Sequence, residues 1–110
     1  MTLENRLSTM ILSCQLLTES CIEDNRSEPL NVDDAIQYLC SLNEGFNTAV
    51  PYIEGLDDLV FSDVRKIIDV CHNFIKFDSI SKRYSLINPR QDRQEFLNQI
   101  VHHFLTAGNI

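Results

Sequence analysis

The chain has 110 residues, the length of one domain, and its 44% hydrophobic residues suffice for a core without disulfides or a structural metal. Aspartate and glutamate (16) outnumber lysine and arginine (9), so the net charge is −7 and we expect no nucleic-acid partner, because phosphates would be repelled. No apolar run approaches the roughly 18 residues that a membrane span needs, so we expect a cytoplasmic protein without a membrane partner.

The first predicted element is a helix over residues 2–23. Its apolar residues recur at spacings of three and four, which is the pattern of a helix with one buried face. The members of this stripe are Leu3, Leu7, Met10, Cys14, Leu17 and Cys21. A polar stretch containing Pro29 follows, so we expect a loop before the next element.

A second helix is expected over residues 32–50. Asn31 can cap its first turn, and Asp33 lies where a carboxylate is favoured by the helix dipole. Pro51 interrupts helical hydrogen bonding while the apolar spacing continues, which predicts a short helical segment near 51–60. The spacing leaves open whether Pro51 kinks one helix or separates two.

The third and fourth helices are expected over residues 62–77 and 89–107. Between them, residues 78–88 are polar, and we expect an irregular loop or a short extended segment there. Asn88 followed by Pro89 fits the start of the fourth helix, because asparagine caps helices and proline is favoured at the first helical position. Together these elements predict an all-α fold, a single-domain bundle of four principal helices.

The neighbours Cys71 and His72 have the side chains of a nucleophile and a base. Consecutive residues on a helix are rotated by about 100°, so Cys71 falls on the buried stripe and His72 on the opposite, charged side. The two side chains are therefore expected to lie apart, and burial disfavours the reactive thiolate. The sequence also contains no glycine-rich phosphate-binding loop. We expect no catalytic residues, no cofactor and no enzymatic activity.

The four cysteines and three histidines do not show the spacing of a metal site. Structural zinc is normally bound by ligand pairs at short spacing, whereas His102 and His103 diverge on one predicted helix. Cys14 and Cys21 would lie roughly 10 Å apart along another helix, which is too far for a disulfide. We therefore expect no metal, and the cysteines are predicted to be free thiols.

Charge is unevenly distributed along the chain. Twelve acidic and two basic side chains give residues 1–64 a charge of −10, and four acidic and seven basic ones give residues 65–110 a charge of +3. Either the two parts pack together and partly cancel, or the acidic part presents a face to a basic partner.

The second interpretation predicts a function. A small acidic helical protein can bind and neutralise or chaperone a basic protein partner, as immunity and inhibitor proteins do. The partner-binding residues that we expect are Glu44, Tyr52, Glu54, Asp57 and Asp58.

Two further hypotheses concern other parts of the chain. Lys82, Arg83 and Arg90 lie near an aromatic residue and the expected start of the fourth helix, which is a weak indication of an anion-binding site. The heptad-like stripes of the first two helices also permit an alternative function, a self-associating, homodimeric structural or regulatory protein.

Overall fold

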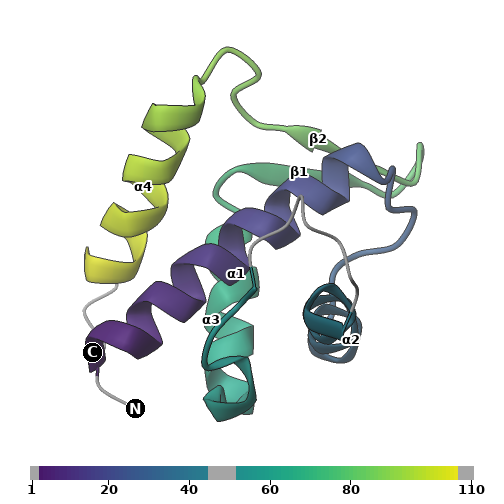
Figure 1. The fold of residues 1–110 in the computed structure, drawn as a ribbon. Helices are drawn as coiled ribbons and strands as arrows, with labels where there is room; N and C mark the ends of the chain where they lie inside the picture. The colour runs from purple at the N-terminus through teal and green to yellow at the C-terminus, as the bar shows by residue number, and fades with distance from the viewer. Residues whose placement is uncertain (1–2, 45–51, 107–110) are drawn as a thin grey trace.

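The computed structural model describes residues 3–44 and 52–106. Its elements in chain order are the helices α1 (Leu3–Glu23) and α2 (Val32–Glu44), the 3-10 turn η1 (Leu56–Asp58), helix α3 (Phe61–Cys71), the strands β1 (Ile75–Asp78) and β2 (Arg83–Leu86), and helix α4 (Arg93–Thr106) (Figure 1). The four predicted helices are confirmed. The fold is not purely all-α, however, because β1 and β2 form a two-stranded antiparallel sheet.

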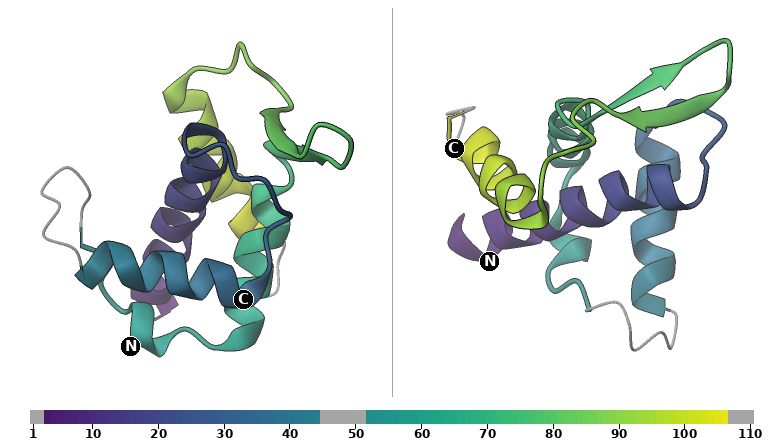
Figure 2. Two further views of the ribbon diagram at one scale, coloured as in Figure 1. Left: turned by 90° about the vertical axis from the view of Figure 1, so that its right-hand side faces the viewer. Right: turned by 90° about the horizontal axis from the view of Figure 1, so that it is seen from above.

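Helix α1 crosses in front of α3, and α2 and α4 lie on either side of this pair (Figure 1). The hairpin of β1 and β2 continues from the end of α3 and projects from the helices. Both views in Figure 2 place α3 and the hairpin on the side of the molecule away from α1. Residues 52–58 and the start of α1 lie at one end of the molecule, and the hairpin lies at the opposite end (Figures 1 and 2).

The core forms where α1 crosses α3. On α1 the predicted stripe is confirmed over its described side chains, since Met10, Cys14, Leu17 and Cys21 are at most 6% exposed and Leu7 is half-buried against the core. The apolar residues of the α3 stripe, to which the sequence assigned Cys71, are buried as well. They are Val64, Ile67, Ile68 and Cys71. The largest fully buried side chains from the remaining elements are Leu39, Ile53, Ile75, Ile100 and Phe104.

The third helix ends at Cys71 and not near residue 77 as predicted. The side-chain amide of Asn73 donates to the carbonyl oxygens of Asp69 and Val70, both at 3.2 Å. Both carbonyl groups belong to the last turn of the helix, and that of Val70 also accepts the backbone N–H of Asn73 at 3.0 Å, so Asn73 stabilises the end of α3 at this point.

Residues 75–78 form β1 instead of the last helical turn. Phe77 pairs with Tyr84 of β2, and the two ring centroids lie 5.1 Å apart. Phe74 and Ile75 are buried. A helix that continued to residue 77 would bury them too, so this short apolar run did not distinguish a helix from a strand. The expectation of a short extended segment within 78–88 is confirmed by β2.

The fourth helix begins at Arg93 and not at residue 89. Asp92 caps it, because its carboxylate accepts a hydrogen bond of 2.8 Å from the backbone N–H of Glu95. Asn88, the predicted cap, instead accepts a hydrogen bond from the N–H of Arg90 and forms a turn.

The expected helical segment near 51–60 is reduced to the three residues of η1. Gly55 precedes it with φ 77°, a left-handed conformation that ends a helix and favours glycine. The second helix is confirmed over 32–44, whereas residues 45–50 and Pro51 lie outside the described residues. The question of a kink at Pro51 therefore stays open.

Candidate functional site

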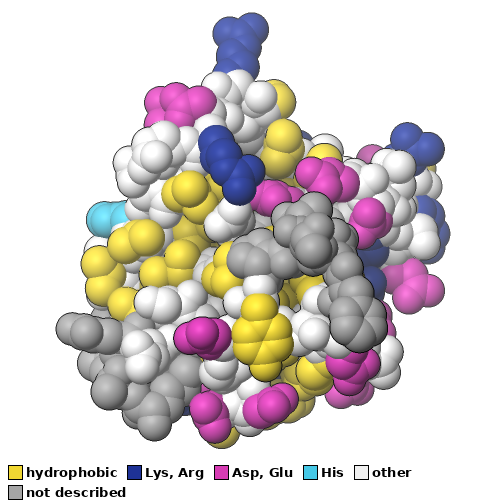
Figure 3. Space-filling model, viewed as in Figure 1, with side chains coloured by type: hydrophobic (Ala, Val, Ile, Leu, Met, Phe, Trp, Pro, Cys, Tyr) yellow, Lys and Arg dark blue, Asp and Glu magenta, His cyan; other side chains and the backbone are white. Residues whose placement is uncertain are grey.

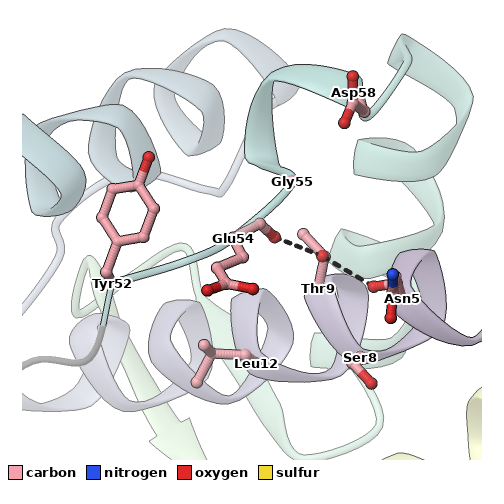
Figure 4. Close-up of a pocket in the computed structure, with 8 residues that line it drawn as sticks. All are labelled: Asn5, Ser8, Thr9, Leu12, Tyr52, Glu54, Gly55 and Asp58. Atoms are coloured by element: carbon pink, nitrogen blue, oxygen red, sulfur yellow. Dashed lines mark hydrogen bonds between the residues drawn. The ribbon is translucent and has the colours of Figure 1, made fainter. Parts of the chain in front are cut away.

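An open groove of about 430 Å³ lies between the first half of α1 and residues 52–58 (Figure 4). We call it the acidic groove. The residues that give it its chemical character are Ser8, Thr9 and Leu12 from α1, and Tyr52, Glu54 and Asp58 from the opposite segment. Two carboxylates, an aromatic ring and two hydroxyls thus face one hollow.

The segment that forms one wall of the groove is held by its backbone and by one buried side chain. Ile53 is fully buried, and its N–H and carbonyl group exchange hydrogen bonds of 2.8 and 2.9 Å with the side chain of Asn43 on α2. The hydroxyl of Thr9 donates to the carbonyl oxygen of Glu54 at 2.6 Å (Figure 4). Because successive side chains of an extended segment point to opposite sides, burial of Ile53 turns Tyr52 and Glu54 outward.

Three of the five residues predicted to bind a partner line the acidic groove: Tyr52, Glu54 and Asp58. Tyr52 is 68% exposed. The carboxylate of Glu54 lies closest to α1, whereas Tyr52 and Asp58 stand toward the two ends of the groove (Figure 4). Glu44, at the end of α2, and Asp57, in η1, are exposed but do not line it.

Sequence reasoning missed the wall that α1 contributes. Ser8 and Thr9 lie beside the apolar stripe of α1, and nothing in their local pattern distinguishes them from other polar helix residues. Their position opposite Glu54 depends on a contact between residues 45 positions apart. Such a contact leaves no periodic signal in one sequence.

The arrangement is suited to a cationic side chain. A carboxylate accepts charge-assisted hydrogen bonds from an ammonium or guanidinium group, and a tyrosine ring attracts a cation over its face. Glu54, Asp58 and the exposed ring of Tyr52 supply both kinds of contact within one groove.

Cys71 contacts Cys14 and not His72. The two sulfur atoms lie 3.7 Å apart, and both cysteines are fully buried free thiols. The hydrogen bond between the thiols, together with burial, raises the pKa of Cys14 well above its usual value, and the same bond lowers the pKa of Cys71. His72 is exposed, and its Nε2 lies 3.4 Å from the hydroxyl of Tyr84. The prediction that Cys71 and His72 face different sides is confirmed.

The histidines of α4 do not join these thiols. His103 packs against Phe74, with ring centroids 5.6 Å apart, and His102 is exposed. Within residues 3–44 and 52–106, no three His, Cys, Asp or Glu side chains lie close enough together to hold a metal ion.

Few ion pairs connect the two differently charged parts of the chain among the described residues. The ion pairs among the described residues are Arg6–Asp63, Arg26–Asp34 and Arg93–Glu19. Only Arg93–Glu19 connects residues 1–64 with residues 65–110. Most charged side chains of the described residues therefore take no part in an ion pair between the two parts of the chain.

The predicted anion-binding residues are all exposed but are not gathered at a helix end. Lys82 lies in the hairpin turn with φ 57°, Arg83 lies on β2, and Arg90 lies in the loop before α4. The carboxylate of Asp92 already occupies the N-terminus of α4. The N-terminus of α4 is therefore not free to bind the anion, as the hypothesis assumed. The three basic side chains themselves remain exposed.

Comparison with protein families, with curated proteins and with solved structures finds no match for this chain. Within the part of the chain that the structure describes, no helix is long and apolar enough to cross a membrane. The groove and the distribution of charge therefore have to carry any functional conclusion.

Proposed function

We propose that this chain is a non-enzymatic protein-binding module whose acidic groove takes a lysine or arginine side chain of a basic partner protein. The observation that carries the proposal is that Tyr52, Glu54 and Asp58 line one groove. Binding of this kind neutralises or chaperones the partner, as an inhibitor or immunity protein does.

Two further observations support the proposal. Residues 19–58 contain ten acidic side chains and one basic side chain, Arg26, and such a charge speeds the encounter with a basic protein. All four cysteines are free thiols, which supports a cytoplasmic location, since oxidising compartments favour disulfides.

The experiment is affinity capture from a lysate of the source cell with three baits. They are the wild type, the groove variant E54K/D58K and the control variant E23K/D24K, which changes the net charge equally at exposed positions outside the groove. We expect one basic protein, retained at near-equal stoichiometry by the wild type and the control and lost from the groove variant.

The control decides what the result means. Equal retention by all three baits removes the groove from the proposal, because its carboxylates would then contribute nothing to binding. Loss from both variants shows that net charge alone attracts the captured protein. Thermal unfolding of each bait confirms that the substitutions leave the fold intact.

One observation favours the alternative of a homodimer. Val101 and Leu105 of α4 are hydrophobic but 37% and 55% exposed. Hydrophobic side chains gather on the surface over α4 and α1 (Figure 3). The α1 stripe, by contrast, is buried in the monomer core. Sedimentation of the wild type and of Leu105→Glu tests this alternative: a dimer that the substitution dissociates supports it, and a wild-type monomer at high concentration excludes it.

A further inference from the structure

Most of the basic side chains form no ion pair with a carboxylate of the described residues. Of the nine lysine and arginine residues, Arg6, Arg26 and Arg93 form ion pairs. The six that form none with any described carboxylate are Arg65, Lys66, Lys76, Lys82, Arg83 and Arg90. All six lie within residues 65–90, and five of them belong to α3 and the hairpin. These are the cations that remain available for an external anion.

Helix α3 directs a row of polar side chains outward. Ser62, Arg65, Asp69 and His72 recur at spacings of three and four, and all are exposed. Lys66 borders this row and is half-buried. The opposite side of α3 packs against α1, so the polar row lies on the free side of the helix.

The hairpin adds cations next to this row. Its register pairs Lys76 with Ser85 and Arg83 with Asp78, so these four exposed side chains share one face while Tyr84 packs inward. Both views in Figure 2 show the hairpin projecting on the same side of the molecule as α3. Lys and Arg side chains are also visible at the edge where the hairpin lies (Figure 3). We call α3 and the hairpin together the basic face.

We propose that the basic face binds duplex DNA, with α3 in the major groove and the Lys82–Arg83 end of the hairpin on the sugar–phosphate backbone. A helix with its side chains is about 10–12 Å wide and fits the major groove of B-DNA, which is about 12 Å wide. The major groove of A-form RNA is too narrow for it. The donors and acceptors of the α3 row would meet base edges, and the lysines and arginines of the hairpin would meet phosphates.

The net charge of −7, from which we expected no nucleic-acid partner, describes the whole chain and not this face. In physiological salt, exposed charges act over about 8–10 Å, whereas the molecule is 41 Å long. The acidic groove and the hairpin lie at opposite ends (Figures 1 and 2). The loop that carries Asp24 and Glu28 lies nearer, because the N–H of Leu30 bonds to Tyr84, and its carboxylates border the hairpin. Asp57 and Asp58 precede α3 at the groove end, so the duplex would approach the hairpin side.

Two exposed carboxylates lie on the basic face itself, since the third, Asp63, is buried and paired with Arg6. The carboxylate of Asp78 accepts a hydrogen bond of 2.9 Å from the N–H of Ile80 within the hairpin turn. Part of its negative charge is therefore already engaged inside the turn. Asp69 is exposed in the middle of the α3 row and opposes a polyanion. The five cations of α3 and the hairpin outnumber these two carboxylates.

The test is fluorescence anisotropy of a labelled, mixed-sequence duplex of about 20 base pairs, which is two turns of B-DNA. For about four phosphate contacts, we expect the affinity to fall about 150-fold between about 50 and 200 mM salt. A single strand of the same length should bind more weakly, because it offers no groove for α3.

Variants locate the site. K82Q/R83Q should weaken binding about tenfold at low salt and reduce the slope of the salt dependence by about two. Asp69→Asn should strengthen binding two- to threefold, about the effect of removing one nearby like charge in water. Arg93→Gln is the control for the single variant Arg83→Gln, because each removes one positive charge but Arg93 lies on α4.

Three results overturn the proposal: no binding of the duplex at about 50 mM salt, tighter binding of the single strand, or weakening by Arg93→Gln equal to that by Arg83→Gln. Each of these positions is exposed, so the variants should unfold at the same temperature as the wild type. The outcome does not depend on whether the acidic groove binds a protein, and the two proposals fail separately.

Discussion

The acidic groove and the hairpin are fixed by comparable contacts and carry opposite charges. The groove segment is held by buried Ile53, whose backbone bonds to the amide of Asn43. The hairpin is held by Tyr84, which is 7% exposed and whose hydroxyl accepts a hydrogen bond of 2.7 Å from the N–H of Leu30. In both regions, one buried side chain and its long-range hydrogen bonds attach a non-helical segment to the helical core.

The difference lies in what each segment presents to solvent. Beside Ile53 stand Tyr52 and Glu54, whereas beside Tyr84 stands Arg83. Ile53 and Tyr84 are the anchors of the two regions, because burial of each one fixes which neighbouring side chains point outward. Substitution of one anchor should therefore change the charged surface of its own region and leave the other region intact. The predictions below test this independence.

The largest effect is expected from Ile53→Ala. Removal of a fully buried isoleucine side chain should lower the free energy of unfolding by about 3 kcal/mol, through lost burial and the cavity left behind. It should also weaken capture of the basic partner, because the groove wall loses its anchor. Urea denaturation measures the stability, and Ile80→Ala is the control, since Ile80 is 92% exposed. Equal losses from both variants would contradict the anchoring role of Ile53.

Tyr84→Phe should have the next largest effect on stability. It keeps the ring but leaves the N–H of Leu30 without its acceptor, at a cost of about 1–2 kcal/mol. Amide hydrogen exchange should accelerate at Leu30 and within the hairpin while the protection of Ile53 is unchanged. Faster exchange at Ile53 as well would show that the two regions are coupled.

Alkaline pH should destabilise the core. Burial raises the pKa of the Cys21 thiol to about 12 and also raises the pKa of Tyr84. Above about pH 9 the unfolded chain releases protons that the folded chain retains, so stability falls as pH rises. The Cys14–Cys71 pair, whose pKa values shift in opposite directions, should contribute less.

Thermal unfolding measures this dependence. We expect a constant midpoint between about pH 6 and 8 and a midpoint several degrees lower at about pH 10. Cys21→Ala should reduce the fall. A midpoint that stays constant up to about pH 10 would show that the buried thiol and phenol do not control alkaline stability.

The smallest effect on stability is expected from Tyr52→Ala. Because Tyr52 is 68% exposed, the free energy of unfolding should change by no more than about 0.5 kcal/mol. Affinity for the captured basic partner should nevertheless fall about tenfold, the effect of losing about 1.4 kcal/mol of contact. Calorimetric titration of the wild type and of the Tyr52→Ala variant with the partner measures this affinity. An unchanged affinity would show that the tyrosine ring is not part of the binding site.

The sequence predicted what depends on local periodicity. The stripes of α1 and α3 follow from spacings of three and four, and Asp33 in the first turn of α2 follows from the helix dipole. The hairpin was missed because Phe74 and Ile75 are compatible with a helix and with a strand. The start of α4 was misplaced because both Asn88 and Asp92 are good caps, and only the fold shows which one is used.

The candidate site could be predicted only in part, for a related reason. The excess of acidic residues in the first part of the chain selected Glu54 and Asp58, and Tyr52 was added as an aromatic residue within the same segment. The wall of the groove that α1 contributes could not be predicted, because the contact of Thr9 with Glu54 joins residues far apart in the sequence. The basic excess of residues 65–110 was visible in the sequence, but the juxtaposition of α3 with Lys76 and Arg83 was not, because it depends on the hairpin that the sequence did not predict.

The most direct measurement is a pair of titrations of the isotope-labelled protein, followed by the chemical shifts of backbone amides. One ligand is the DNA duplex and the other is a short oligolysine peptide as a probe for the acidic groove. We expect the duplex to shift amides of α3 and the hairpin, including Arg65, Lys76 and Arg83, and the peptide to shift residues 52–58 and the first half of α1. Shifts of one common set by both ligands, or of residues 52–58 by the duplex, would contradict the separation of two charged surfaces.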